Sequence, residues 1–281
     1  MKTIRSRHLV SGGMIALTYL AAFLAILPLI LILIHLVAKG ASSLSISFFT
    51  HMPRPVGEAG GGMANAIVGT LMLIGIACLI GLPVGIGAGL YLAEKRTTPL
   101  AYTARFLSDV LNGLPSIVIG IFAWELLVKH RGFSALAGGV ALGAMMIPLV
   151  TRTTEEMLLT VPNSLREAAL ALGYAKWRTS IAIVLRTSLA GIATGALVAI
   201  ARIAGETAPL LFTAFGNTFW STSLRQAIAA LPLQIYVYSI SAYEEWHRLA
   251  WAGALVLITL VLVISIAARF VTRSRFGAAV D

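Results

Sequence analysis

Two residues of opposite charge, Arg202 and Glu206, lie in an otherwise apolar stretch and are the strongest candidates for chemistry in this chain. Because they are four residues apart, a helix would place them on one face. A guanidinium can donate two hydrogen bonds at once to an oxyanion. Arg202 could therefore contact an anion in transit, while Glu206 holds the guanidinium in place and prevents tight trapping of the anion. Thr207 adds a hydroxyl, and Pro209 could open the helix locally. The alternative is a self-neutralising Arg202–Glu206 pair that only fixes packing, and spacing alone leaves both open.

The other reactive residues form no catalytic or metal-binding set. The five histidines are scattered, the single cysteine, Cys78, lies in an apolar run, and no G-x-S-x-G elbow is present. The chain also lacks a G-x-x-x-x-G-K-[ST] phosphate loop, so we do not expect it to bind ATP. These absences favour a protein that is not an enzyme and that binds no metal or cofactor. If it moves a solute uphill, the energy comes from an ion gradient or another subunit.

Composition places these residues in a membrane protein. Of the 281 residues, 58% are hydrophobic and only 11% are charged, whereas soluble domains carry about 25% charged residues. A span needs roughly 20 apolar residues, so we expect an all-α polytopic protein with six transmembrane helices. The predicted spans cover residues 14–38, 64–93, 107–128, 133–150, 188–215 and 249–271. The first is too long for a cleaved signal peptide and is expected to be retained.

The distribution of basic residues predicts the orientation of these spans. With both termini in the cytoplasm, the inner segments hold 14 of the 21 basic residues and the outer segments hold 6, while Arg202 falls inside the fifth span. Positive residues concentrate on the cytoplasmic side, so this arrangement is the expected one. The surplus charge then faces anionic membrane lipid, and nucleic acid is not needed as a partner.

Other polar residues of the spans give weaker predictions. Asp109 and Asn112, in the third span, are lesser candidates for the substrate path, and Asp109 better suits helix packing. Glu125, near the outer end of that span, could pair with Lys129, four residues on.

In the second span, a G-x-x-x-G-x-x-x-G run at residues 81–89 lets helices approach closely in lipid. We therefore expect that span inside a bundle or at a subunit interface.

The outer segments are the least specified parts of the sequence. The segment 40–63 is rich in Ser, Gly and Pro and is expected to be irregular. The segment 216–247 holds several Trp and Tyr residues that suit either a membrane–water boundary or a surface that docks an external partner. Within it, residues 224–241 are apolar enough for a partly immersed helix or a re-entrant piece.

A polar stretch, residues 151–186, separates the fourth and fifth predicted spans. Ser164 followed by Glu167 predicts an N-cap with a capping box, and Gly173 suits the left-handed residue that closes a helix. Pro162 stops any helix that arrives from upstream. We therefore expect a short, separately bounded cytoplasmic helix. Because long ordered loops are uncommon without a function, docking of a cytoplasmic partner and a purely structural cap both remain open.

Residues Glu167-Ala168-Ala169, then Gly173 and Ile183-x-Leu185, resemble the EAA loop of ABC-importer permeases. That pattern ends in Pro, where this chain has Arg186. The resemblance implies a type I importer permease with a MetI-like core over residues 61–281, after a first helix and outer loop over residues 1–60. It also implies that residues 164–173, Ala168 and Ala169 included, form a coupling helix in a groove of the ATPase subunit.

A second resemblance is more specific. The run 201–214, which contains G-E-T-A-P-L-L-F-T-A, is similar to the signature of permeases in phosphate-specific ABC importers, and segments 109–120, 148–157 and 161–169 support it. The resemblance implies a bacterial inner-membrane protein that forms half of a phosphate path and works by alternating access. Its implied partners are a PstC-type permease, a PstB-type ATPase dimer that binds ATP and Mg²⁺, and a periplasmic PstS-type phosphate-binding protein. A permease for another oxyanion (phosphonate, sulfate or molybdate) and a gradient-driven carrier are the alternatives.

Overall fold

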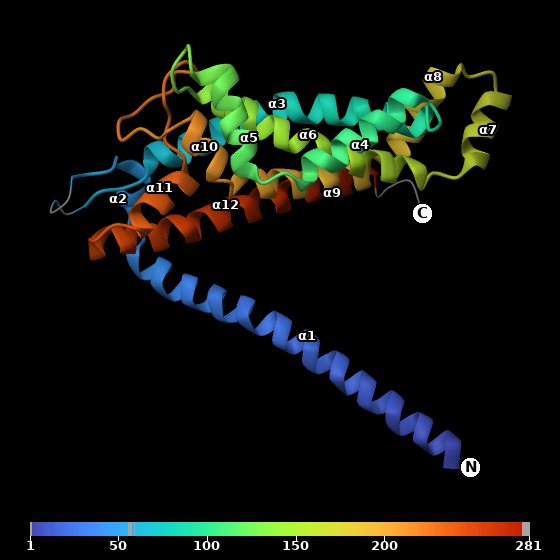
Figure 1. The fold of residues 1–281 in the computed structure, drawn as a ribbon, viewed down its shortest axis with the longest axis horizontal. Helices are drawn as coiled ribbons and strands as arrows, with labels where there is room; N and C mark the ends of the chain where they lie inside the picture. The colour runs from blue at the N-terminus through green and yellow to red at the C-terminus, as the bar shows by residue number, and fades with distance from the viewer. Residues whose placement is uncertain (1, 56–57, 59, 277–281) are drawn as a thin grey trace.

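The chain folds into a helical bundle, and the computed structural model describes residues 2–55, 58 and 60–276. The long helices α3, α6, α9 and α12 lie beside one another, while most of α1 stands apart (Figure 1). In chain order the helices are α1 (Lys2–Ser43), α2 (Ile46–Thr50), α3 (Ala64–Glu94), α4 (Pro99–Gly113), α5 (Ser116–Ala123), α6 (Ala135–Leu159), α7 (Asn163–Ala171), α8 (Lys176–Thr179), α9 (Leu185–Ala204), α10 (Ala208–Thr213), α11 (Leu231–Ser239) and α12 (Glu244–Phe276). Two π-helical turns, η1 (Trp124–Val128) and η2 (Ser180–Val184), continue α5 and join α8 to α9.

Five helices in the described part of the chain are long and apolar enough to cross a membrane, and the number is six if one bent helix pair counts as a single span. The five are Val10–Ser43, Ala64–Glu94, Ala135–Leu159, Lys176–Ala204 and Glu244–Phe270. The all-α membrane fold is therefore confirmed. The charge count that predicted the orientation rests partly on side chains of residues 2–9 and 271–276, which lie outside the described part.

The predicted third span is wrong as a single helix. Helix α4 begins at Pro99, well before residue 107, and ends at Gly113, and the chain turns by 105° before α5. Pro115 explains the break: it has no N–H to continue the helix, and it forces Leu114 into an extended conformation (φ −71°, ψ 137°). The predicted pair at the end of η1 is confirmed, since Lys129 Nζ lies 2.5 Å from Glu125 Oε1.

The predicted bounds of the fourth and fifth spans are also wrong. Helix α6 continues to Leu159, nine residues beyond the predicted end, because Thr151, Thr154, Glu155 and Leu158 are buried against the bundle. The next long helix starts at Lys176 rather than 188 and stops at Ala204 rather than 215. The connection that carries α7 is therefore residues 160–175, about half the predicted length.

Glycines bring α3 and α6 into close contact along a line that we call the glycine seam, as the second-span pattern predicted. A Cβ atom added at Gly85 would lie 2.7 Å from Cβ of Val150, and one added at Gly89 would lie 2.6 Å from Cβ of Thr154. Real Cβ atoms do not approach so closely, so only glycine fits at these positions. Around this seam, α9 and α10 complete a buried apolar core that includes Leu73, Leu142, Met146, Ile203 and Leu210.

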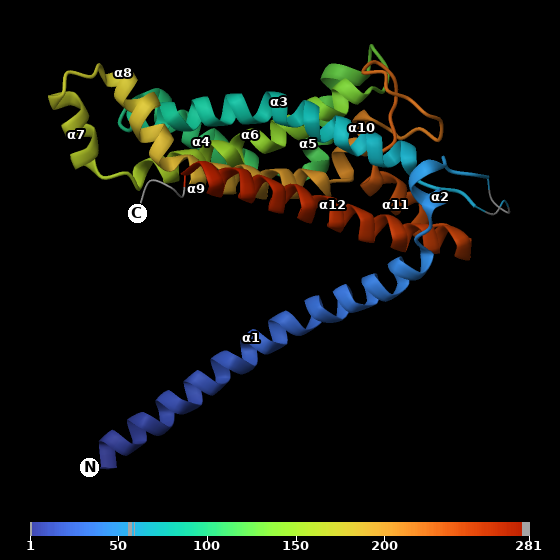
Figure 2. The same cartoon turned by 180° about the vertical axis from the view of Figure 1, so that it is seen from behind.

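Among the described side chains, helix α1 contacts the bundle near its C-terminal end. There the ring of His35 meets that of Trp251 edge-on at 5.0 Å, and Gly40 lets α1 approach Trp251 and Leu255 of α12. Toward the N-terminus α1 diverges from the bundle (Figures 1 and 2). Most apolar side chains between Val10 and Val37 are therefore exposed in the isolated chain.

The outer segments are more ordered than predicted. The segment 40–63 includes the end of α1 and the short helix α2, whereas its described residues after Thr50 form no helix. The predicted apolar piece within 224–241 contains α11, which is tied to α3 because Thr70 Oγ1 accepts the N–H of Leu231 (2.8 Å). Asn65 Nδ2 donates to the carbonyl of Asn217 (2.8 Å) and anchors the preceding loop. These bonds pack α11 against the core rather than leaving it at the surface.

Candidate functional site

The candidate substrate residues lie at a break between α9 and α10. Helix α9 ends at Ala204, and the N–H groups of Gly205 and Glu206 bond to the carbonyls of Arg202 and Ile203 in a tightened last turn. The expectation that Arg202 and Glu206 share one helix face is therefore wrong, because Glu206 lies past the helix end. Pro209 accounts for the break, as its ring would clash with the carbonyl of residue 205 in a continuous helix.

Arg202 and Glu206 nevertheless remain close. Arg202 Nε lies 4.0 Å from Glu206 Oε1, at the outer limit of an ion pair. The Arg202 side chain is 44% exposed and that of Glu206 is 19% exposed. Thr207 precedes the first residue of α10, and its hydroxyl caps nothing there. A loosely held guanidinium with exposed donors can bind an oxyanion through its planar fork.

Close packing fixes this break in position. A Cβ atom added at Gly120 of α5 would lie 2.7 Å from Cα of Pro209, so glycine is required where α5 crosses α10. Within α10, the Thr213 hydroxyl donates to the carbonyl of Pro209 (2.7 Å), and Leu210 is buried in the core. The elements beside Arg202 are therefore rigid, although the guanidinium itself is exposed.

The short helix predicted within residues 151–186 is present as α7, but its predicted start is wrong. The helix begins at Asn163, Pro162 takes the N-cap position, and no side-chain hydrogen bond caps this end. Pro162 already has the φ angle of a helix start, and its carbonyl accepts the N–H of Leu165 (3.2 Å), so Ser164 falls inside the helix. Neither the Ser164 N-cap nor the Glu167 capping box forms.

The predicted end of α7 is confirmed. Gly173 has a φ of +82°, in the left-handed region that favours glycine. Its N–H bonds to the carbonyl of Leu170 (3.0 Å), and the N–H of Tyr174 bonds to that of Ala169 (3.1 Å). These two bonds make a Schellman motif, which turns the chain sharply away from the helix.

The surface around α7 is rich in exposed apolar side chains. Ala169 is buried, whereas Glu167 and Ala168 are exposed on the helix. Nearby, Leu165, Leu170, Leu172, Tyr174 and Trp177 are exposed as well. Arg186, where the EAA pattern has Pro, is the second residue of α9, and the helix is unbroken there. Several exposed apolar side chains within one short segment are typical of a protein–protein contact.

An ion pair that the sequence analysis missed connects α7 to the bundle. The guanidinium of Arg166 pairs with the carboxylate of Glu94, the last residue of α3. The same guanidinium donates to the carbonyl of Leu158 near the end of α6 (3.4 Å). Because α3 and α6 are the two helices joined by the glycine seam, Arg166 links the short helix directly to the core of the bundle.

A second missed cluster is centred on Glu155 of α6, whose side chain is only 3% exposed. One carboxylate oxygen accepts from Arg105 Nε (2.6 Å) and the other from Arg152 Nη1 (2.8 Å). Arg105 also donates to the carbonyls of Arg96 and Leu92, at the end of α3. Arg152 Nε lies 3.2 Å from Asp109 Oδ1, so the cluster joins α3, α4 and α6.

Asp109 and Asn112, the weaker substrate-path candidates, lie on α4, whereas Arg202 lies on α9. Asp109 makes the helix–helix contact with Arg152 that suits packing. Asn112 is half-buried, and its Oδ1 has no hydrogen-bond partner among the described residues. The only sequence signal for the Glu155 cluster was the i, i+3 spacing of Arg152 and Glu155, since Arg105 is 50 residues away.

Comparison with known proteins identifies the class. Residues 85–276 match the family described as the binding-protein-dependent transport system inner membrane component, and the chain belongs to this family. Its curated relatives include phosphate transport system permease proteins PstA. The relative from Yersinia pestis is 52% identical over 245 residues, which are 86% of this chain and 83% of the relative. That from Haemophilus influenzae is 46% identical over 258 residues, which are 91% of each chain.

A solved structure with the same fold comes from a more distant protein. The inward-facing MetNI methionine ABC transporter matches with a TM-score of 0.60 at 20% identity, over 75% of this chain and 96% of that chain. The MetI-like fold and the resemblance to phosphate importer permeases are thus confirmed. The chain is a multi-pass permease subunit of an ABC transporter, and permeases of this class work with an ATPase and a binding protein.

Proposed function

We propose that this chain forms half of the path of an ATP-driven phosphate importer, and that phosphate contacts Arg202 in transit. The PstA relatives support phosphate over phosphonate, sulfate or molybdate. The observation that carries the site is the helix break itself, where an exposed guanidinium lies 4.0 Å from its carboxylate. Such an arrangement leaves the donors of Arg202 available to an oxyanion.

Glu206 would keep this contact weak. A carboxylate near the guanidinium competes with the arriving phosphate and repels it, so phosphate binds and leaves without becoming trapped. The hydroxyl of Thr207, next along the break, can donate one further hydrogen bond. The Glu206 side chain is partly buried and therefore stays near Arg202 while phosphate passes.

The energy would come from a partner. We propose that α7 docks on a PstB-type ATPase dimer through its exposed Ala168 and surrounding apolar side chains. ATP and Mg²⁺ would be bound there, and this chain would hold no cofactor and perform no ATP chemistry. A PstC-type permease would complete the path, and a PstS-type protein would deliver phosphate outside. Both termini would then be cytoplasmic, as the basic residues favour.

Movement of α7 would reach the path by two routes. Arg166 connects α7 to the ends of α3 and α6. The second route is the helix from Lys176 to Ala204, along which Arg202 lies 26 residues, or about 39 Å, from the start. The coupling helix and Arg202 are therefore at opposite ends of one long helical element. A displacement of α7 by the ATPase would tilt this element and change access to the break.

Uptake by the reconstituted complex tests the role of Arg202. Arg202→Ala should abolish phosphate uptake while the subunits still co-purify, and Arg202→Lys should restore only part of the uptake, because Lys lacks the planar fork. Arg248→Ala, an exposed arginine remote in sequence, serves as the control. Unchanged uptake in Arg202→Ala would refute a place in the path. Uptake that persists without any ATPase and ignores vanadate would support a gradient-driven carrier instead.

A labelling experiment tests the orientation separately. A cysteine at Ser164, in a chain whose Cys78 is replaced by Ala, should react with an impermeant maleimide only from the cytoplasmic side. Ser164 is exposed on α7, so its accessibility does not limit the reaction. Labelling from outside would reverse the proposed topology.

A further inference from the structure

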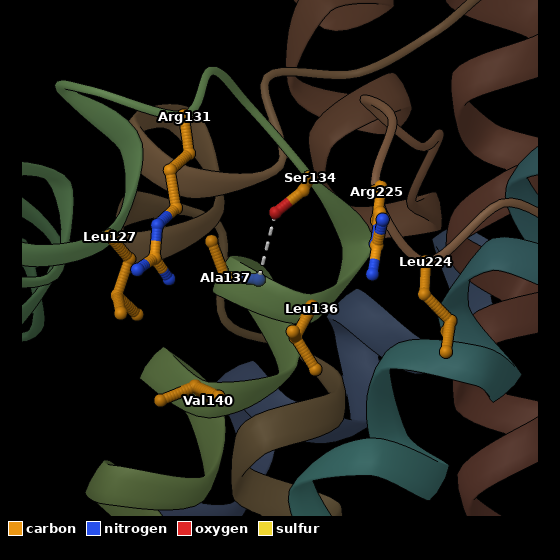
Figure 3. Close-up of a pocket in the computed structure, with 8 residues that line it drawn as sticks. All are labelled: Leu127, Arg131, Ser134, Leu136, Ala137, Val140, Leu224 and Arg225. Carbon is orange, nitrogen blue, oxygen red and sulfur yellow. Dashed lines mark hydrogen bonds between the residues drawn. The ribbon is translucent and has the colours of Figure 1, made fainter.

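Two arginines from separate loops line one pocket away from the α9–α10 break. The pocket has a volume of about 550 Å³ and lies between the end of η1, the first turns of α6 and the loop before α11. Arg131 and Arg225 are its charged residues, and Figure 3 shows their side chains on either side of Ser134 and Leu136. The other lining residues are mostly aliphatic, including Leu127, Val140 and Leu224.

The backbone of each arginine is held in place. Arg225 lies between Leu224 and Gln226, whose carbonyls accept the N–H groups of Leu136 and Ala135 in the first turn of α6 (2.9 Å each). On the opposite side, the N–H groups of Arg131 and Gly132 both bond to the carbonyl of Val128, and Gly132 turns the chain with a φ of +81°. Two guanidinium groups are thus presented to one cavity from fixed backbones rather than from free loops.

The charge of these guanidinium groups is not balanced within the described part of the chain. Neither side chain has a hydrogen-bond or ion-pair partner among the described residues. The carboxylate nearest to Arg131 in the sequence is that of Glu125, which is already paired with Lys129. The mostly aliphatic lining lowers the polarity around the two guanidinium groups, which strengthens electrostatic attraction to an anion. The pocket therefore has a net positive charge and a mostly aliphatic lining.

We propose that Arg131 and Arg225 form a second binding site, specific for a phosphate group. Two planar forks can together donate four hydrogen bonds to the oxygens of one phosphate. The group could belong to free inorganic phosphate that enters the path, or to the head of an anionic phospholipid whose chains lie against Leu127 and Val140. Both sources share this chemistry, and the site does not rest on Arg202 lying in the path.

The pocket is structurally connected to the break. The N–H of Ser134, the N-cap of α6, donates to the carbonyl of Thr213 at the end of α10 (3.0 Å). Helix α10 starts at Ala208, so the pocket rim and Glu206 are separated by a helix of six residues, about 9 Å long. Helix α10 and the Ser134–Thr213 hydrogen bond therefore link the pocket rim to the break that carries Glu206.

Binding measurements on the complete transporter in an Arg202→Ala background isolate this site from the proposed one. The test variant is Arg131→Gln with Arg225→Gln, the charge-retaining variant is Arg131→Lys with Arg225→Lys, and the control is Arg248→Gln. Two probes are used: equilibrium binding of radiolabelled inorganic phosphate to the purified transporter, and mass spectrometry of the phospholipid that co-purifies with it. Loss of two charged donors should weaken occupancy at least about tenfold, whereas the Lys variant should keep most of it.

Each outcome decides the proposal. Loss of phosphate binding in the Gln variant but not in the control supports free phosphate as the occupant. Loss of a co-purifying anionic phospholipid, with phosphate binding unchanged, supports the lipid headgroup. If both probes match the control, the proposal is overturned. It is also overturned if the Gln variant changes only the stimulation of ATPase by the binding protein, because the arginines would then contact a protein surface.

Discussion

Replacing Glu155 by Gln should destabilise the protein by about 2 kcal/mol. Glu155 is buried and accepts charged hydrogen bonds from Arg105 (2.6 Å) and Arg152 (2.8 Å), one on each oxygen. An amide of the same size keeps one acceptor but presents its N–H₂ group to the other guanidinium. The lost bond contributes about 1.5–3 kcal/mol.

The loss should stay near 2 kcal/mol for a structural reason. Removing one partner of a fully buried ion pair costs about 3–5 kcal/mol, since the other charge is left without compensation. Here Arg105 keeps two backbone carbonyls, and Arg152 keeps Asp109 at 3.2 Å. Both guanidinium groups are also partly exposed to solvent.

The matched control is Glu125→Gln. Its carboxylate also accepts from a cation, Lys129 at 2.5 Å, but the two side chains are 53% and 43% exposed. Exposed pairs on a helix contribute about 0.3–0.5 kcal/mol. Thermal unfolding of the purified complex in one detergent should therefore show a clear drop in Tm for Glu155→Gln and almost none for Glu125→Gln.

A double-mutant cycle completes the test. Arg105→Gln combined with Glu155→Gln should cost less than the sum of the two single changes, because the two groups interact directly. Equal Tm values for Glu155→Gln and Glu125→Gln, or strict additivity in the cycle, would refute the view that Glu155 holds α3, α4 and α6 together.

Three further predictions follow from the helix geometry. Gly85→Ala should sharply reduce folded yield, because its Cβ would lie 2.7 Å from that of Val150, whereas Gly87→Ala, with open space around it, should behave as wild type in size-exclusion chromatography. Gly173→Val should weaken ATPase co-purification or uncouple hydrolysis from uptake, since a β-branched residue is strained at a φ of +82°; intact coupling would contradict the role of this turn. Ser164→Ala should lower the free energy of unfolding by less than the roughly 1 kcal/mol that loss of an N-cap costs, because Ser164 caps nothing; a larger loss would support the predicted capping box.

The sequence predicted the long apolar helices well, because a stretch of apolar residues in lipid has few alternatives to a helix. The second span was placed within a residue of α3, and its glycines were correctly assigned to a packed face. Gly173 was also predictable, since a left-handed residue at a helix end has a strong local preference. In each case the signal lies within a few neighbouring residues.

Features that depend on contacts between distant residues were not predicted. The Glu155 cluster joins residues 50 positions apart, and Arg166 pairs with Glu94 across 72 positions. Polar residues between 151 and 159 suggested a loop, whereas burial and ion pairs keep them in α6. Pro115 and Pro209 were both visible, but a proline shows where a helix can break and not by how much, so the 105° bend was unexpected.

The glycine seam between α3 and α6 limits how this protein can change shape. At Gly85 and Gly89 the backbone of α3 packs directly against the Cβ atoms of residues on α6. No flexible side chains lie between the two helices there, so they cannot easily slide or rotate against each other. The pair must therefore move as one rigid body. A conformational change must then involve other helices moving against this pair. The proposed tilt of the helix Lys176–Ala204, which carries Arg202, would be one such movement.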